Sequence, residues 1–117
     1  MTDTTTPTRI AEEYSRAWMG RDLDAAMRFV ADDVVLDAPA GRIEGADAYR
    51  RFLNGFLGLM TEATITKVYG DDGGAAVHYV TVTEKVKESR GSDQLTIRDG
   101  LIRHAVTIFD RLPFQQA

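Results

Sequence analysis

The period of the hydrophobic pattern changes near the middle of this 117-residue sequence. Up to Met60, apart from one short interruption, apolar residues recur every three or four positions, which is the spacing of one face of an amphipathic helix. From Thr61 onward they alternate with polar residues, as they do in a half-buried β-strand. The chain is therefore expected to fold as an α+β protein, with helices first and an antiparallel meander after them.

The first half is expected to hold three helices and one short strand. A threonine followed by proline starts the first helix, a glycine ends it, and an aspartate caps the second. Between the second and third helices lies an apolar run of three residues, too short for a helix and followed by a proline and a glycine, so it indicates a strand. The expected helices cover about residues 7–19, 23–30 and 46–60, and the strand covers residues 34–36.

The second half is expected to hold four antiparallel strands joined by tight turns. Asp71 to Gly74 and Asp99-Gly100 are typical hairpin turns between β-branched and aromatic runs. The charged segment from Glu84 to Gly91 is expected to be a solvated connection. The expected strands cover residues 61–69, 75–83, 92–97 and 101–110.

Both faces of the two longest expected strands carry apolar residues. In the second of the four strands, Val77, Tyr79, Thr81 and Thr83 alternate with Ala76, His78, Val80 and Val82; in the last, Ala105, Thr107 and Phe109 alternate with Ile102, His104, Val106 and Ile108. A sheet with one solvated face would be polar on that face, so the outer face is expected to be covered as well. The helices cover only one side, which predicts a homodimer through the outer sheet face.

Composition excludes several classes of function. The net charge is −4 and there is no basic run longer than Arg50-Arg51, which argues against nucleic acid or a membrane as partner. The chain has no cysteine, and His78 and His104 have no further ligand at metal-binding spacing, so neither a metal site nor a cofactor is expected. We expect one cytoplasmic domain over residues 1–117, with residues 1–6 loosely ordered, because neither a signal peptide nor an apolar span is visible.

Four short motifs support a family resemblance. The motifs are Gly20-Arg-Asp-Leu-Asp-Ala-Ala-Met, Ala31-Asp-Asp-Val-Val, Gly41-Arg-Ile-Glu-Gly and Arg98-Asp-Gly-Leu-Ile-Arg. With them, the sequence from Ile10 to Asp110 resembles the nuclear transport factor 2-like superfamily, and within it the SnoaL-like branch of polyketide cyclases, related to ketosteroid isomerases and limonene epoxide hydrolase. The resemblance implies a cone-shaped half-barrel, with three N-terminal helices packed on a curved antiparallel sheet around a small-molecule cavity.

The resemblance to ketosteroid isomerase implies three catalytic candidates. Tyr14 stands where a phenol donates a hydrogen bond, and Asp93 stands where a neutral carboxylic acid does. The position of the carboxylate base is Ala38. Asp37 is one residue away, and in a regular strand that offset turns its side chain to the other face unless a bulge intervenes. The residues expected to line the cavity for an apolar ligand are Trp18, Phe52, Phe56, Tyr79, Thr107 and Phe109.

Two functions are compatible with these residues. The first is an isomerase or cyclase that acts on a small apolar carbonyl compound by proton transfer with enolate stabilisation. Tyr14 and Asp93 would then be the donors, and Asp37 or a bound water the base. Burial beside Leu95 and Ile97 would raise the pKa of Asp93. The alternative is a non-catalytic ligand-binding or dimerisation module of the same fold, which the alanine at the base position favours. Thr107 stands where the epoxide hydrolase pattern has its aspartate, so that chemistry is not expected.

Overall fold

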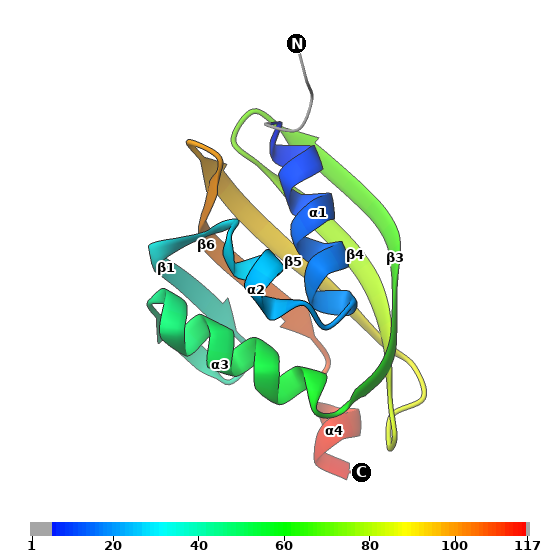
Figure 1. Ribbon diagram of the computed structural model, residues 1–117. Helices are drawn as coiled ribbons and strands as arrows, with labels where there is room; N and C mark the ends of the chain where they lie inside the picture. The colour runs from blue at the N-terminus through cyan, green and yellow to red at the C-terminus, as the bar shows by residue number, and fades with distance from the viewer. Residues whose placement is uncertain (1–5, 117) are drawn as a thin grey trace.

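The computed structural model describes residues 6–116, and Figure 1 shows the arrangement of their helices and strands. Within this range all the strands form one curved, open sheet of order β2-β1-β6-β5-β4-β3. The α+β half-barrel that the sequence predicts is confirmed. The helices are α1 (Pro7–Met19), α2 (Leu23–Met27), α3 (Ala46–Leu57) and α4 (Leu112–Gln116); the strands are β1 (Val30–Ala38), β2 (Gly41–Glu44), β3 (Met60–Asp71), β4 (Gly74–Thr83), β5 (Ser89–Arg98) and β6 (Leu101–Phe109).

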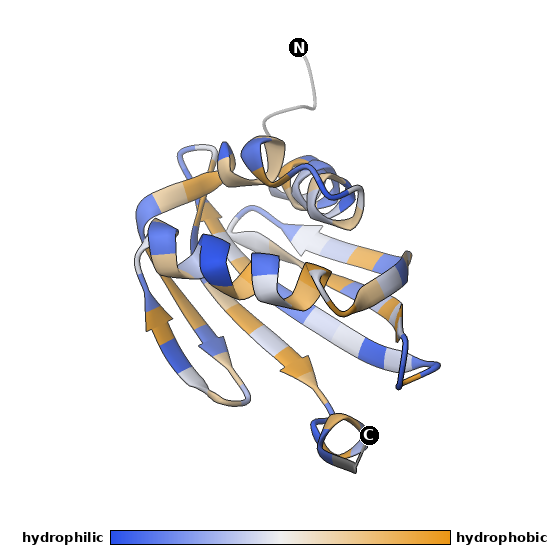
Figure 2. Ribbon diagram, turned by 60° about the horizontal axis from the view of Figure 1, so that its bottom comes forward, coloured by the Kyte–Doolittle hydropathy of each residue, from blue (hydrophilic) through white to orange (hydrophobic). Residues whose placement is uncertain are grey.

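Helices α1, α2 and α3 lie together on the concave face of the sheet, and α4 lies apart at the end of β6 (Figures 1 and 2). The core fills the space between these helices and the sheet. Apolar side chains from both layers make up this core, and their removal from water stabilises the fold. Its largest buried members include Ile10, Tyr14, Trp18, Tyr49, Leu53, Leu36, Val77, Tyr79, Leu95, Ile97 and Ile102.

The first helix has the predicted bounds. The side chain of Thr6 accepts a hydrogen bond from the backbone N–H of Arg9, Pro7 occupies the first turn, and Gly20 follows the last residue. These signals are local in the sequence, which is why they are readable from it. The expectation of loose order over residues 1–6 falls mostly outside the described residues.

The second helix is shorter than predicted and β1 is longer. Asp22 caps α2 as expected, but the helix ends at Met27, and Val30 begins β1. Val30 pairs with Ile102 of β6, and the carbonyl of Phe29 accepts a 2.7 Å hydrogen bond from the N–H of Ile102. An apolar residue at this spacing fits a helix or a strand, and the pairing with a distant strand decides between them. This β1–β6 pair is parallel, whereas every other strand pair among the described residues is antiparallel.

Other bounds differ from the sequence prediction as well. Strand β2, hydrogen-bonded to β1, and the short helix α4 were not predicted. The third helix ends at Leu57, because Gly58 closes it and Met60 already pairs with Thr83 in the sheet. Strand β5 begins at Ser89, so the charged connection after β4 is shorter than expected.

The alternation predicted for β4 is confirmed. Its concave side chains are all buried, and its convex side chains are all half-buried, from Ala75 to Thr83. The convex face also exposes apolar side chains on other strands, with Tyr69 57% and Ile108 52% exposed. The homodimer through this face stays a prediction.

Candidate functional site

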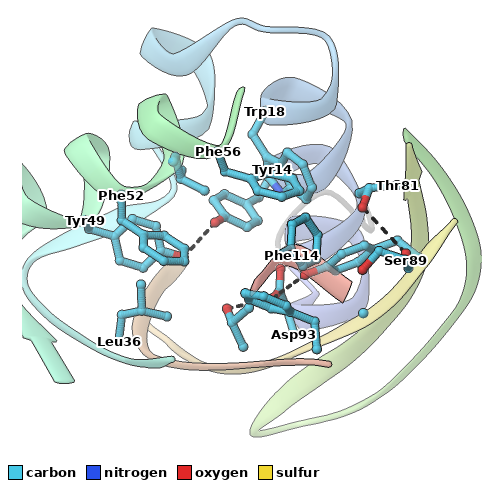
Figure 3. Close-up of a pocket in the computed structure, with 15 residues that line it drawn as sticks. Tyr14, Trp18, Leu36, Tyr49, Phe52, Phe56, Thr81, Ser89, Asp93 and Phe114 are labelled. Atoms are coloured by element: carbon cyan, nitrogen blue, oxygen red, sulfur yellow. Dashed lines mark hydrogen bonds between the residues drawn. The ribbon is translucent and has the colours of Figure 1, made fainter. Parts of the chain in front are cut away.

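A small cavity lies between α1 and α3 on one side and the concave face of β4, β5 and β6 on the other (Figure 3). Its free volume is about 30 Å³, room for about two water molecules. Most of the wall is apolar or aromatic. The lining residues are Tyr14, Trp18, Leu36, Tyr49, Phe52, Leu53, Phe56, Tyr79, Thr81, Ser89, Gly91, Asp93, Thr107, Phe109 and Phe114.

Tyr14 and Tyr49 form a hydroxyl pair in the wall made by the helices. Their oxygens are 2.6 Å apart, and their rings meet edge to face at 6.4 Å between centroids. Burial is the main cause that raises the pKa of both hydroxyls, so both keep their protons at neutral pH. Tyr49 was not among the predicted site residues, and no signal in the sequence pairs it with Tyr14. Together they place O–H groups at one side of the cavity.

Asp93 lies on the opposite wall, in the middle of β5, and is 5% exposed. Its Oδ1 accepts hydrogen bonds from the Tyr79 hydroxyl at 3.1 Å and the Thr107 hydroxyl at 2.8 Å. Burial raises the pKa of Asp93 to about 6, against the opposing effect of these two bonds, which favour the charged form. The predicted direction is confirmed. A pKa near 6 leaves both the neutral and the ionised form of Asp93 accessible close to neutral pH, so the carboxyl group has the range of a proton donor and of an acceptor.

The ring of Tyr79 rests on Gly91, its cross-strand partner in β5. A Cβ at position 91 would lie 2.6 Å from Cε1 of Tyr79, closer than two carbons can approach without displacement. Glycine at this position therefore lets Tyr79 lie flat on the sheet, within reach of Asp93. The sequence indicated Gly91 only as the end of a connection.

Asp37 does not line the cavity. Its carboxylate forms a two-bond ion pair with Arg42 at 2.8 and 3.2 Å and contacts Nε2 of His104 at 2.7 Å. The bonds from Arg42 and then His104 lower the pKa of Asp37 to about 2. The side chain of the preceding residue, Leu36, is the one that reaches the cavity, so the one-residue offset from Ala38 turns Asp37 away. The irregularity of β1 falls between Val30 and Val35, before this position, and does not turn Asp37 inward.

Aromatic side chains close the rest of the cavity. Trp18, Phe52, Phe56, Tyr79, Thr107 and Phe109, the six residues predicted to contact a ligand, all line it. Trp18 meets Phe56 and Tyr79 edge to face, at 6.3 and 5.5 Å between centroids. Phe114 of α4, which was not among the predicted residues, packs edge to face on Phe109 at 5.6 Å. No periodic pattern marks α4 in the sequence.

Among residues 6–116, no group of three or more His, Asp or Glu side chains could hold a metal ion. No helix in the same range is long and apolar enough to cross a membrane.

Three helices pack on the concave face of a curved sheet, with a cavity between the two layers. This arrangement places the protein in the class of small α+β proteins with an internal pocket. Residues 11–105 match the SnoaL-like domain, and the chain belongs to this family, within the nuclear transport factor 2-like superfamily. Among curated protein sequences, none matches the chain.

Solved structures resemble this fold closely. A protein from Kribbella flavida is 42% identical with a TM-score of 0.92, covering 97% of this chain and 93% of its own. A second K. flavida protein, assigned as a ketosteroid isomerase, is 24% identical with a TM-score of 0.79 and covers 93% and 79%. An epoxide hydrolase from M. tuberculosis is 19% identical with a TM-score of 0.77 and covers 98% and 90%. The last two likenesses show the fold alone.

Proposed function

We propose that this protein binds a small, largely apolar carbonyl compound in the cavity and moves a proton within it, as an isomerase or a cyclase does. The observation that carries the proposal is Asp93, the one carboxyl group among the residues that line the cavity, with a pKa near 6. A general base works best when its pKa lies near the working pH. The K. flavida protein that is 24% identical is assigned as a ketosteroid isomerase, and this name agrees with the proposed class of reaction.

Asp93 is the acid–base group in this mechanism. Its ionised carboxylate takes the proton from the carbon next to the carbonyl, and the C–H electron pair becomes the C=C bond of an enolate. The protonated carboxyl then returns the proton to a carbon of the ligand and is a carboxylate again. Tyr79 and Thr107 hold the carboxylate in place through their bonds to Oδ1.

Tyr14 and Tyr49 stabilise the charge that develops on the ligand oxygen. Both hydroxyls are protonated, and one of their two protons is left over after they bond to each other. A donor held in place in a cavity that excludes water stabilises an oxyanion better than water does, by about 3 kcal/mol for one such bond. In this mechanism the oxyanion donors are on the helices and the base is on the sheet.

The second candidate function is ligand binding without catalysis. The alanine at position 38, where the resemblance puts the base, favours it. In either function a side chain has to move, because 30 Å³ leaves no room for an organic ring. Phe114 on the short α4 is the side chain best suited to move. In both functions the ligand is apolar and replaces this ring at one side of the cavity.

The two functions differ in whether the protein speeds the exchange of hydrogen for deuterium at the carbon next to a carbonyl. Cyclic ketones are incubated with the protein in heavy water and followed by proton NMR. The proposal expects the wild-type protein to speed the exchange and Asp93→Asn to abolish it. Asp37→Asn is the matched control, since it removes a carboxylate outside the cavity, and it should exchange at the wild-type rate. Binding without exchange in the wild type would favour the non-catalytic function.

A further inference from the structure

Two hydrogen-bond donors in the cavity wall have no acceptor among the described residues. The indole Nε1–H of Trp18, a side chain 2% exposed, has no hydrogen-bond partner. The Tyr14 and Tyr49 hydroxyls share one hydrogen bond, which uses one of their two protons, and neither has another partner. Buried donors without acceptors are rare in native proteins, because each loses its bond to water without replacing it.

The side chains of Tyr14 and Trp18 lie next to each other. Tyr14 and Trp18 are four residues apart on α1, so their side chains leave the same face of the helix one turn apart. Edge contacts with Phe56 and Tyr79 hold the indole in its orientation. Figure 3 shows the indole on the helix side of the cavity, next to the Tyr14 ring, while Asp93 comes from the sheet on the other side.

We infer that the indole N–H of Trp18 is a second oxyanion donor, and that it binds the same ligand oxygen as the free hydroxyl proton of the Tyr14–Tyr49 pair. The ligand is then a compact cyclic ketone or dicarbonyl whose enolate oxygen lies against α1 and whose acidic C–H faces Asp93. This inference rests on the proposed function.

The chemistry of the donors explains why an indole suits this place. A carboxyl group donates a hydrogen bond only while it is protonated, and Asp93 as the base is ionised before each proton transfer. An indole N–H is a donor only and does not titrate near neutral pH. The oxyanion donors therefore stay in place while the base gains and loses its proton.

The first experiment uses the fact that the chain has a single tryptophan, so one indole N–H signal appears in a proton–nitrogen NMR spectrum. The probe is dimedone, an apolar cyclic dione that is an enolate at neutral pH. The protein is the full chain carrying Asp93→Asn, because the neutral amide represents the carboxyl after proton uptake. The inference expects the indole proton to shift downfield and to exchange more slowly with water. A bound dimedone that leaves this signal unchanged would overturn it.

The second experiment compares two variants in the same background. Trp18→Phe removes the N–H and keeps an aromatic ring, whereas Phe56→Leu alters the packing beside the indole and keeps the N–H. Each is titrated with dimedone and with the neutral monoketone of the same ring. A hydrogen bond to a charged group is strong enough that Trp18→Phe should weaken dimedone binding about tenfold more than ketone binding. Phe56→Leu should weaken both alike.

The outcomes distinguish a failure of the indole donor from a failure of the proposed function. Equal losses for both ligands in Trp18→Phe, with Asp93-dependent exchange intact in the wild type, would overturn the indole donor and leave the proposed function standing. Absence of binding and of exchange in the wild-type protein would overturn the proposed function itself. If Trp18→Phe does not fold, the indole signal of the Asp93→Asn protein still decides the question.

Discussion

The hydroxyl of Thr107 donates a 2.8 Å hydrogen bond to Oδ1 of Asp93. The two residues are direct partners across β5 and β6, so the sheet register sets this contact. The bond favours the carboxylate, whereas burial favours the neutral acid, and the balance leaves the pKa of Asp93 at about 6. The protonation of this carboxyl is thus adjustable from a neighbouring strand without altering Asp93 itself.

Thr107→Val is expected to raise the pKa of Asp93 above 6. Valine has nearly the shape of threonine and cannot donate, so the carboxylate loses one of its two hydrogen bonds and stays equally buried. Carbon-13 NMR of the Asp93 carboxyl against pH measures the change. Thr81→Val is the control, because the Thr81 hydroxyl bonds the carbonyl of Ser89 and not Asp93. Equal titration of Asp93 in the wild type and Thr107→Val would contradict this account.

Asp93→Asn is expected to stabilise the fold at pH 7 and not at pH 4. In the folded protein the pKa of Asp93 is about 6, and its unfolded value is near 3.8. A raised carboxyl pKa destabilises the folded state as pH rises from about 4 to about 6, since the unfolded chain ionises first. A pKa difference of about two between the folded and unfolded states corresponds to a penalty of about 3 kcal/mol at most. Asparagine removes this penalty, while its oxygen still accepts hydrogen bonds from Tyr79 and Thr107.

Urea unfolding at the two pH values tests this prediction. The gain in unfolding free energy should appear between pH 4 and pH 6 and stay constant above. Asp37→Asn serves as the contrasting variant, because the pKa of Asp37 is lowered to about 2, so its stabilising effect is present at neutral pH and lost in acid. A gain for Asp93→Asn that is independent of pH would argue against a raised pKa.

Most faces of the strands were readable from the sequence, and the distances across the cavity were not. The prediction for Ile102 was wrong: strict alternation assigns it to the convex face with His104, but a register shift between β5 and β6 turns it into the core. Strand alternation assigns Tyr79 and Thr107 to one face and turns Asp37 to the other, because side chains change sides at every residue. Tyr14 and Tyr49 are 35 positions apart, and only the packing of α1 against α3 brings their hydroxyls together. Sequence patterns assign faces, and contacts between elements depend on packing.

The errors in the predicted elements have the same origin. Val30 fits the apolar face of α2, but its pairing with Ile102 makes it the start of β1. Helix α4 has five residues, fewer than two turns, so no periodic stripe reveals it. Its Phe114 nevertheless lines the cavity, and the free volume follows from such side-chain packing rather than from any local pattern.

Val106→Lys is expected to yield monomers or aggregates if the convex face of the sheet joins two copies. Val106 is half-buried on β6, and Ile108 two residues later is 52% exposed. A lysine in the middle of an apolar interface would leave a charge without a partner. Light scattering on the eluting protein gives the mass of each species. Wild-type protein that elutes as a monomer at micromolar concentration would contradict the predicted homodimer. Asn54→Lys is the charge control, because Asn54 is exposed on α3, on the other side of the sheet.

Phe114→Ala is expected to speed the binding of an apolar ring and to cost little stability. The side chain is only half-buried and belongs to a short terminal helix, but it lines a cavity with just 30 Å³ of free volume. If the ring of Phe114 occupies the ligand's space in most molecules, apparent affinity is reduced by the fraction that is open. Its removal should raise the association rate of dimedone about tenfold for an open fraction of about one tenth, measured by the fluorescence of the single tryptophan.

Leu112→Ala alters the same helix at a side chain that is 54% exposed and does not line the cavity, and it should leave the rate as it is. Equal rates in Phe114→Ala and the wild type would mean that the ligand enters past another part of the wall.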